Sequence, residues 1–95
     1  MAVTRQTIAF AVRGPIERSD LPGLCDRVCA LFAQTAPAVA FCDVSEVPAD
    51  AVTVDALARL QLAARRCACK VRLRNASPQL RSLVEFMGLE NVLPD

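Results

Sequence analysis

Histidine, tryptophan and tyrosine are absent from this chain of 95 residues. Histidine is the most versatile acid–base side chain of enzymes, and its absence also excludes every Ser-His and Cys-His nucleophile pair. Only three glycines are present, and none lies in a phosphate-binding loop of the G-x-x-x-x-G-K-[ST] type. The sequence therefore predicts no catalytic residues, no autonomous nucleotide hydrolysis and no cofactor.

Long apolar runs are also missing. The longest apolar stretches, such as residues 36–42, fall well short of the ~20 residues that a transmembrane helix needs. The first eleven residues contain Arg5 but lack the long apolar centre of a secretory signal. We therefore expect a cytoplasmic protein with no direct membrane insertion.

The cysteines do not have the spacing of a disulfide framework. Their number is odd, and they lie at Cys25, Cys29, Cys42, Cys67 and Cys69. Zinc sites more often use C-x₂-C knuckles, and the C-x-x-C motif of thioredoxin-type chemistry is absent. We expect small buried residues and no metal site. The alternative is a metal or redox protein that uses the two cysteine pairs, which stoichiometric zinc in the purified protein would reveal.

What the chain does contain is 54% hydrophobic residues in alternating strand-like and helix-like segments. Residues 7–12, 38–44 and 70–74 have strand patterns. Between and after them, apolar residues at helical spacing predict three helices: one capped by Ser19 or Asp20, one over 52–66 capped by Asp50, and one from Ser77-Pro78 to a stop at Gly88. This β-α-β-α-β-α order predicts a mainly parallel sheet in a single domain over residues 1–95.

The expected core follows the same patterns. The nearly unbroken apolar run of residues 38–44 is typical of a strand covered on both faces. All four phenylalanines, at positions 10, 32, 41 and 86, occupy core-like positions. We therefore expect their rings to be buried.

Charges are segregated along the chain. From 43 to 55 they are all acidic, at Asp43, Glu46, Asp50 and Asp55, as in a polar loop with helix caps. A paired-carboxylate glycosidase is the alternative, but it would need a cleft for sugar.

From 56 to 84 the charged residues are all basic, at Arg59, Arg65, Arg66, Lys70, Arg72, Arg74 and Arg81. With a net charge of +1 and no aromatic residues around these positions, we expect a solvated or partner-facing basic rim and no nucleic acid.

Two segments together carry a family resemblance. Residues 39–53, VAFCDVSEVPADAVT, and residues 75–93, in which Pro78 opens a helix and Gly88-Leu89 follows it, resemble the STAS domain of bacterial anti-sigma-factor antagonists. The resemblance implies an α/β fold with a sheet of about four mainly parallel or mixed strands packed by about three helices. It also implies a non-enzymatic module for signalling and transcription regulation. Such a module binds an anti-sigma factor, often a serine kinase, until a serine is phosphorylated.

The family's phosphorylated serine lies in an Asp-Ser-[Ser/Thr]-Gly turn, and this sequence departs from that motif. Without gaps, Asp50 matches the aspartate, Ala51 the acceptor, and Val52 and Thr53 the last two positions. Alanine has no hydroxyl, so we expect the usual phosphoswitch to be missing. Thr53 is a candidate substitute acceptor in the first turn of the helix, but the favoured interpretation is an ordinary first-turn threonine with a local hydrogen bond. The resemblance places the partner contacts at Asp50, Ala51, Val52, Thr53, Asp55 and Arg59.

The same fold also occurs as a small cytoplasmic subunit of ABC transporters, including lipid transporters, where it binds the ATPase. The turn without an acceptor favours this as the alternative function. For either function we expect a monomer or a weak homodimer.

Overall fold

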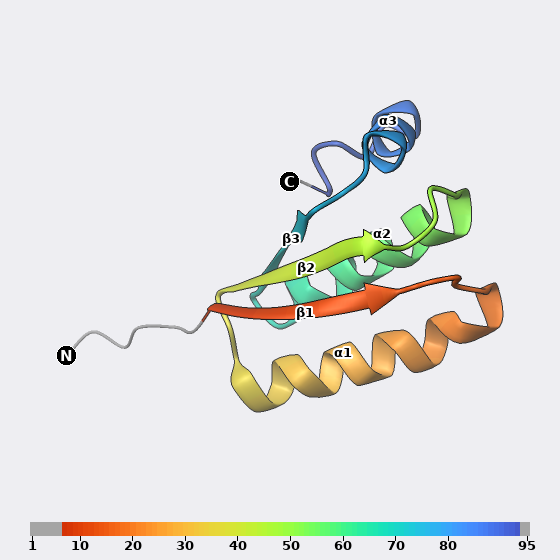
Figure 1. Ribbon diagram of the computed structural model, residues 1–95. Helices are drawn as coiled ribbons and strands as arrows, with labels where there is room; N and C mark the ends of the chain where they lie inside the picture. Colours follow the sequence, from red (N-terminus) through yellow and green to blue (C-terminus); the bar gives the residue numbers. More distant parts are fainter. Residues whose placement is uncertain (1–6, 94–95) are drawn as a thin grey trace.

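The computed structural model describes residues 7–93 (Figure 1). Its elements in chain order are β1 (Thr7–Arg13), the 3₁₀ turn η1 (Arg18–Asp20), α1 (Leu21–Thr35), β2 (Val39–Glu46), α2 (Ala51–Arg66), β3 (Lys70–Arg74) and α3 (Pro78–Phe86). The alternating order expected from the sequence is confirmed, with element ends that differ by one or two residues. Within the described range, no helix is both long enough and apolar enough to cross a membrane.

The sheet has three strands in the order β1-β2-β3, and both pairs are parallel. Ala9 lies beside Phe41, which lies beside Arg72, and this register places the carboxyl ends of all three strands at one edge. The expected sheet of about four strands is therefore corrected to three within residues 7–93. The residue patterns themselves predicted three strands, and the fourth rested on the family resemblance.

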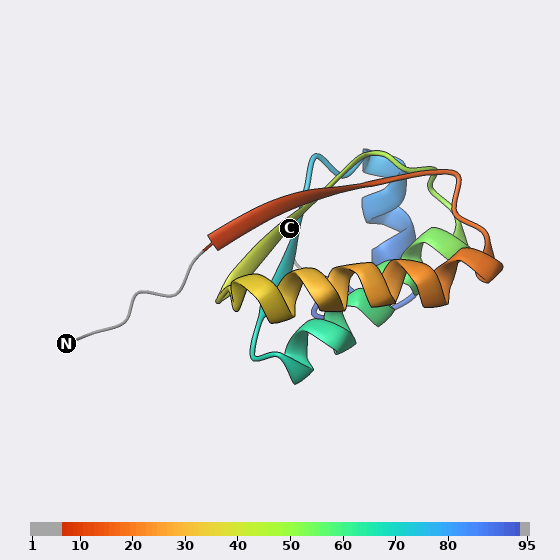
Figure 2. The ribbon, with the colours of Figure 1, turned by 90° about the horizontal axis from the view of Figure 1, so that it is seen from below.

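The hydrophobic core lies between the sheet and the helices α1 and α2, which pack side by side on one face of it (Figure 2). Alternate strand residues and one stripe of each helix enter it, among them Val12, Phe32, Ala40, Cys42, Val44, Leu57, Leu60, Val71 and Leu73. The ring of Phe32 meets that of Phe10 edge-on, with centroids 6.2 Å apart. Full burial of one such large side chain contributes about 1.5–3 kcal/mol.

Two expectations about burial were wrong, and Phe10, which is half-buried against the core, meets its expectation only in part. Phe41 and Val39, on the other face of β2, are only half-buried, because all described helices lie against the opposite face or beside the sheet edge. Phe86 is 87% exposed, because the buried stripe of α3 runs through Leu80 and Val84. The helical spacing of Phe86 therefore predicted burial wrongly in this short helix.

Helix ends follow the expected signals except at α1. The side chains of Asp50 and Ser77 accept the backbone N–H groups of Thr53 and Leu80, and Gly88 beyond α3 has a φ of 72°. Asp20 precedes α1 but makes no side-chain cap to it. Its carboxylate instead accepts the backbone N–H of Glu17, which closes η1.

Gln61 connects three segments and was not singled out by the sequence. It is 2% exposed on α2, and its Nε2 donates to the carbonyls of Val71 and Val92 at 2.8 Å each. Its Oε1 accepts the N–H of Val71, also at 2.8 Å. One side chain thus joins α2 to the outer edge of β3 and to the C-terminal segment.

Candidate functional site

The turn between β2 and α2 forms the candidate site. Asp50 has an extended backbone, with φ −134° and ψ 167°, and its Oδ1 accepts the N–H of Thr53 at 2.8 Å. This bond satisfies one of the free N–H groups at the start of the helix. It also fixes the direction in which the first residues of α2 leave the turn.

The first turn of α2 presents some of the predicted contact residues and hides another. Asp50 and Ala51 are exposed and Val52 is half-buried. Thr53 is fully buried, and its hydroxyl has no hydrogen-bond partner within residues 7–93. The solvent-accessible surface of this turn therefore consists of the carboxylate of Asp50, the methyl group of Ala51 and part of the Val52 side chain. The Thr53 hydroxyl could meet a kinase only if this turn opened.

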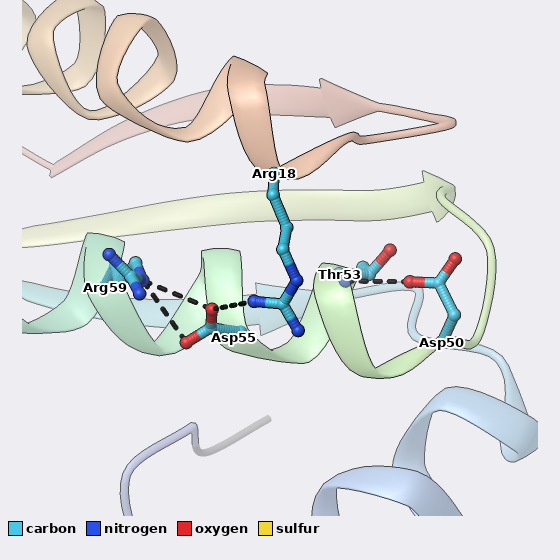
Figure 3. Close-up of polar contacts among 5 residues, drawn as sticks. All are labelled: Arg18, Asp50, Thr53, Asp55 and Arg59. Carbon is cyan, nitrogen blue, oxygen red and sulfur yellow. Dashed lines mark hydrogen bonds and ion pairs between the residues drawn. The ribbon is translucent and has the colours of Figure 1, made fainter.

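The other two predicted contact residues lie one to two turns further along α2 and contact each other (Figure 3). Arg59 Nε lies 3.2 Å from Asp55 Oδ1 and 3.3 Å from Oδ2. This is the favourable i,i+4 order with the acid first. The pairing expected from the sequence is therefore present, and it fixes both side chains on the same side of the helix.

Arg18 completes this cluster from outside α2. Its Nη1 lies 3.5 Å from Asp55 Oδ2, so Asp55 is shared by two guanidinium groups (Figure 3). Exposed ion pairs of this kind contribute about 0–1 kcal/mol each, and their effect here is mainly on geometry. Arg18 was not predicted from the sequence, because a contact between η1 and α2 leaves no local spacing signal.

The end of β1 packs against the same turn. The N–H of Gly14 donates to the carbonyl of Glu46 at 3.1 Å, and a Cβ at Gly14 would overlap the Pro48 ring. Arg13 Nε lies 3.0 Å from Glu46 Oε2. The position of the turn thus depends on a glycine at the end of the neighbouring strand.

The acidic residues at this edge serve as structural acceptors. Asp43 accepts the backbone N–H of Ser45 at 2.9 Å and the amide of Asn75 at 3.1 Å. These bonds, with the nearby Arg74, lower the pKa of its carboxyl, so it is ionised at neutral pH. Glu46 is paired to Arg13, Asp50 caps α2 and Asp55 bridges two arginines, so each of these carboxylates has a structural partner.

The cysteines are all free thiols. Burial, reinforced by the charge of Asp43, raises the pKa of Cys42 to about 12. Burial and the neighbouring Cys29 raise the pKa of Cys25. No group of three or more potential metal ligands exists within residues 7–93, so the two cysteine pairs do not combine into one site there.

The sheet, its helices and the turn before α2 define the class of fold, which is the STAS fold expected from the sequence. Among solved structures, the chain is similar to the anti-sigma factor antagonist SpoIIAA in its unphosphorylated form. The TM-score is 0.70 at 20% sequence identity, over 100% of this chain and 84% of that chain. At this level of identity, the likeness shows the fold alone. No protein-family model and no curated protein sequence matches the chain.

Proposed function

We propose that this domain is a protein-binding module of the anti-sigma-factor-antagonist type, without catalytic activity of its own. Its partner is an anti-sigma factor or a related serine-kinase-type protein in the cytoplasm. The observation that carries the proposal is the whole-chain similarity of fold to an anti-sigma factor antagonist. The turn at the start of α2, with Asp50 and Ala51 exposed and Val52 half-buried, is the contact surface, and Asp55 and Arg59 lie beside it.

The partner interaction lacks the phosphoserine switch. Ala51 stands at the exposed first position of α2, where the helix macrodipole would favour a phosphate, but it has no hydroxyl. Thr53 does not replace it in this conformation, because its hydroxyl is buried. The domain is therefore competent to bind without a dephosphorylation step, as a monomer or a weak homodimer.

Ala51 substitutions test this function against the alternative, a transporter ATPase as partner. The partner is first identified by affinity capture with the wild-type domain and then purified for calorimetric titration. Ala51→Glu should weaken binding at least about tenfold, because it places a carboxylate in the interface. An acid at the first helical position is compatible with the macrodipole, so the fold should remain stable. Leu62→Glu, at an exposed site further along α2, adds the same charge as a control.

Ala51→Ser adds the missing hydroxyl. If the partner is a serine kinase of this type, incubation with ATP should add one phosphate to this variant and none to the wild type, as measured by intact mass. The modified variant should then lose affinity. Equal binding by wild type and Ala51→Glu would remove the turn from the interface. Capture of a transporter ATPase would replace the proposed partner.

A further inference from the structure

The second face of the sheet has no covering element within residues 7–93 (Figure 2). We call it the open face and define it by Ala9 and Ala11 of β1, Val39, Phe41 and Asp43 of β2, and Lys70, Arg72 and Arg74 of β3. The alternating burial of β1 and β3 shows the same division, since every second residue of these strands is exposed. This face lies apart from the first turn of α2.

An uncovered face is unusual for this type of sheet. All-parallel sheets occur almost only where both faces are covered. The central strand β2 also has apolar residues on both of its faces, with Ala40 and Cys42 inside and Val39 and Phe41 half-buried on the open face. The composition of β2 fits a strand buried on both sides, of which the described helices cover one.

The charge on the open face is concentrated on one strand. Lys70 and Arg74 are exposed on β3, with Arg72, which has a contact of its own, between them. The guanidinium carbon of Arg74 lies 3.9 Å from the centroid of the Phe41 ring. Asp43 lies at the carboxyl end of this face, near Arg74, and is bonded to Asn75, while the ion pair of Arg13 with Glu46 lies beyond it on β1 and β2. The face therefore combines a floor of small and apolar side chains with a basic border.

We propose that the open face is a docking surface for an acidic protein segment. Apolar side chains of that segment lie on Ala9, Val39 and the free part of Phe41, and its carboxylates meet Lys70 and Arg74. Complementarity assigns this partner, because the apolar floor is matched by apolar side chains and the basic residues at its border are matched by carboxylates. The proposal goes beyond the interaction at the α2 turn and does not depend on it.

Two other occupants fit the face less well. A second copy of the face would bring Lys70 and Arg74 opposite either themselves or the small residues of β1. The carboxylates at the end of the face, Asp43 and Glu46, are already bonded to Asn75 and paired with Arg13. Single-stranded nucleic acid needs several aromatic rings as stacking platforms. This face has one ring, Phe41, and a guanidinium already lies over it.

The probe for the test is a short synthetic peptide in which glutamate alternates with leucine, titrated into the ¹⁵N-labelled domain. We expect the amide shift changes to map to the three strands and the affinity to fall with added salt. Lys70→Glu combined with Arg74→Glu should weaken binding at least about tenfold. Arg65→Glu combined with Arg66→Glu makes the same charge change at exposed positions of α2 and should bind as the wild type does.

Ala9→Glu provides a second variant, because it adds a carboxylate to the exposed floor without removing a contact with Phe41. It should also weaken binding, and thermal unfolding of each variant checks that the fold is intact. The proposal would be overturned if the Arg65→Glu, Arg66→Glu control variant lost as much peptide affinity as the β3 variant, or if the amide shift changes were confined to the helices. Tighter binding of a peptide with lysine in place of glutamate, or of an oligothymidylate, would also overturn it. Concentration-dependent dimerisation that protects the strands would assign the face to a second copy instead.

Discussion

At the start of α2, two residues that lie two positions apart differ in solvent exposure. Ala51 is exposed without a hydroxyl, and Thr53 has a hydroxyl but is buried with no partner for it within the described residues. Helix geometry explains the difference, because residues two apart on a helix point in different directions. The spacing of the family motif identified this turn in the sequence, but it could not show which of the side chains in the turn faces solvent.

Gly14 controls the position of this turn. In Gly14→Ala, the new Cβ would overlap the ring of Pro48, and the resulting displacement should lower the free energy of unfolding by about 1–3 kcal/mol. Urea denaturation measures this change. Because the displaced segment leads into Asp50, the affinity for the partner should fall as well.

Gly23→Ala is the matched control. A Cβ at this position of α1 would meet Arg27 Nη1 at 3.5 Å, which is an ordinary contact. Replacing a glycine within a helix should raise the free energy of unfolding by about 0.5–1 kcal/mol. If both glycine variants had equal stability, close packing of Gly14 against Pro48 would be wrong as an explanation.

At the scale of elements, the strands and helices were predictable because each carries its own periodicity. The caps at Asp50 and Ser77 and the stop at Gly88 fixed the helix ends for the same local reason. What failed was non-local: the uncovered face of β2, the exposed ring of Phe86 and the bridge from Arg18 to Asp55. Each of these depends on which element packs where, and a one-dimensional pattern does not contain that information.

Gln61 gives a prediction for the joint between α2 and β3. Gln61→Leu keeps the size of the side chain but leaves the N–H and C=O of Val71 without their partner. Each unsatisfied buried group costs about 1–3 kcal/mol, so the free energy of unfolding should fall by roughly 2–6 kcal/mol. Chemical denaturation gives the value, and Gln34→Leu on the exposed side of α1 is the control.

Hydrogen exchange adds a local readout to that prediction. The amide of Val71 should lose protection in Gln61→Leu more than the amides of β1 do. A uniform loss of protection, or no loss of stability, would show that the bonds of Gln61 do not hold β3 in place.

For the molecule as a whole, Asp43 should contribute to the dependence of stability on pH. Hydrogen bonds from Ser45 and Asn75 lower its pKa below the usual value of 3.8 in the folded state. A lowered carboxyl pKa stabilises the fold above the unfolded-state value, and this contribution is lost as the pH falls through the folded-state pKa. The stability difference between wild type and Asp43→Asn should therefore be present at neutral pH and shrink in acid.

Thermal unfolding of both proteins across that pH range measures the effect. Asp26→Asn, at an exposed position of α1, makes the same change in charge. If the difference in stability between wild type and Asp43→Asn stayed constant from neutral to acidic pH, the hydrogen bonds of Asp43 would not favour its ionised form.

The bonds of Gln61 also bear on how this domain could polymerise. A sheet grows into a fibre only when both of its edges accept a new strand. The amide of Gln61 already occupies the outward N–H and C=O groups of Val71, as a neighbouring strand would. Growth at β3 is thus obstructed, and among the described residues β1 is the edge left for strand addition. A domain that accepts strands on one edge forms closed pairs, whereas continuous filaments require both edges.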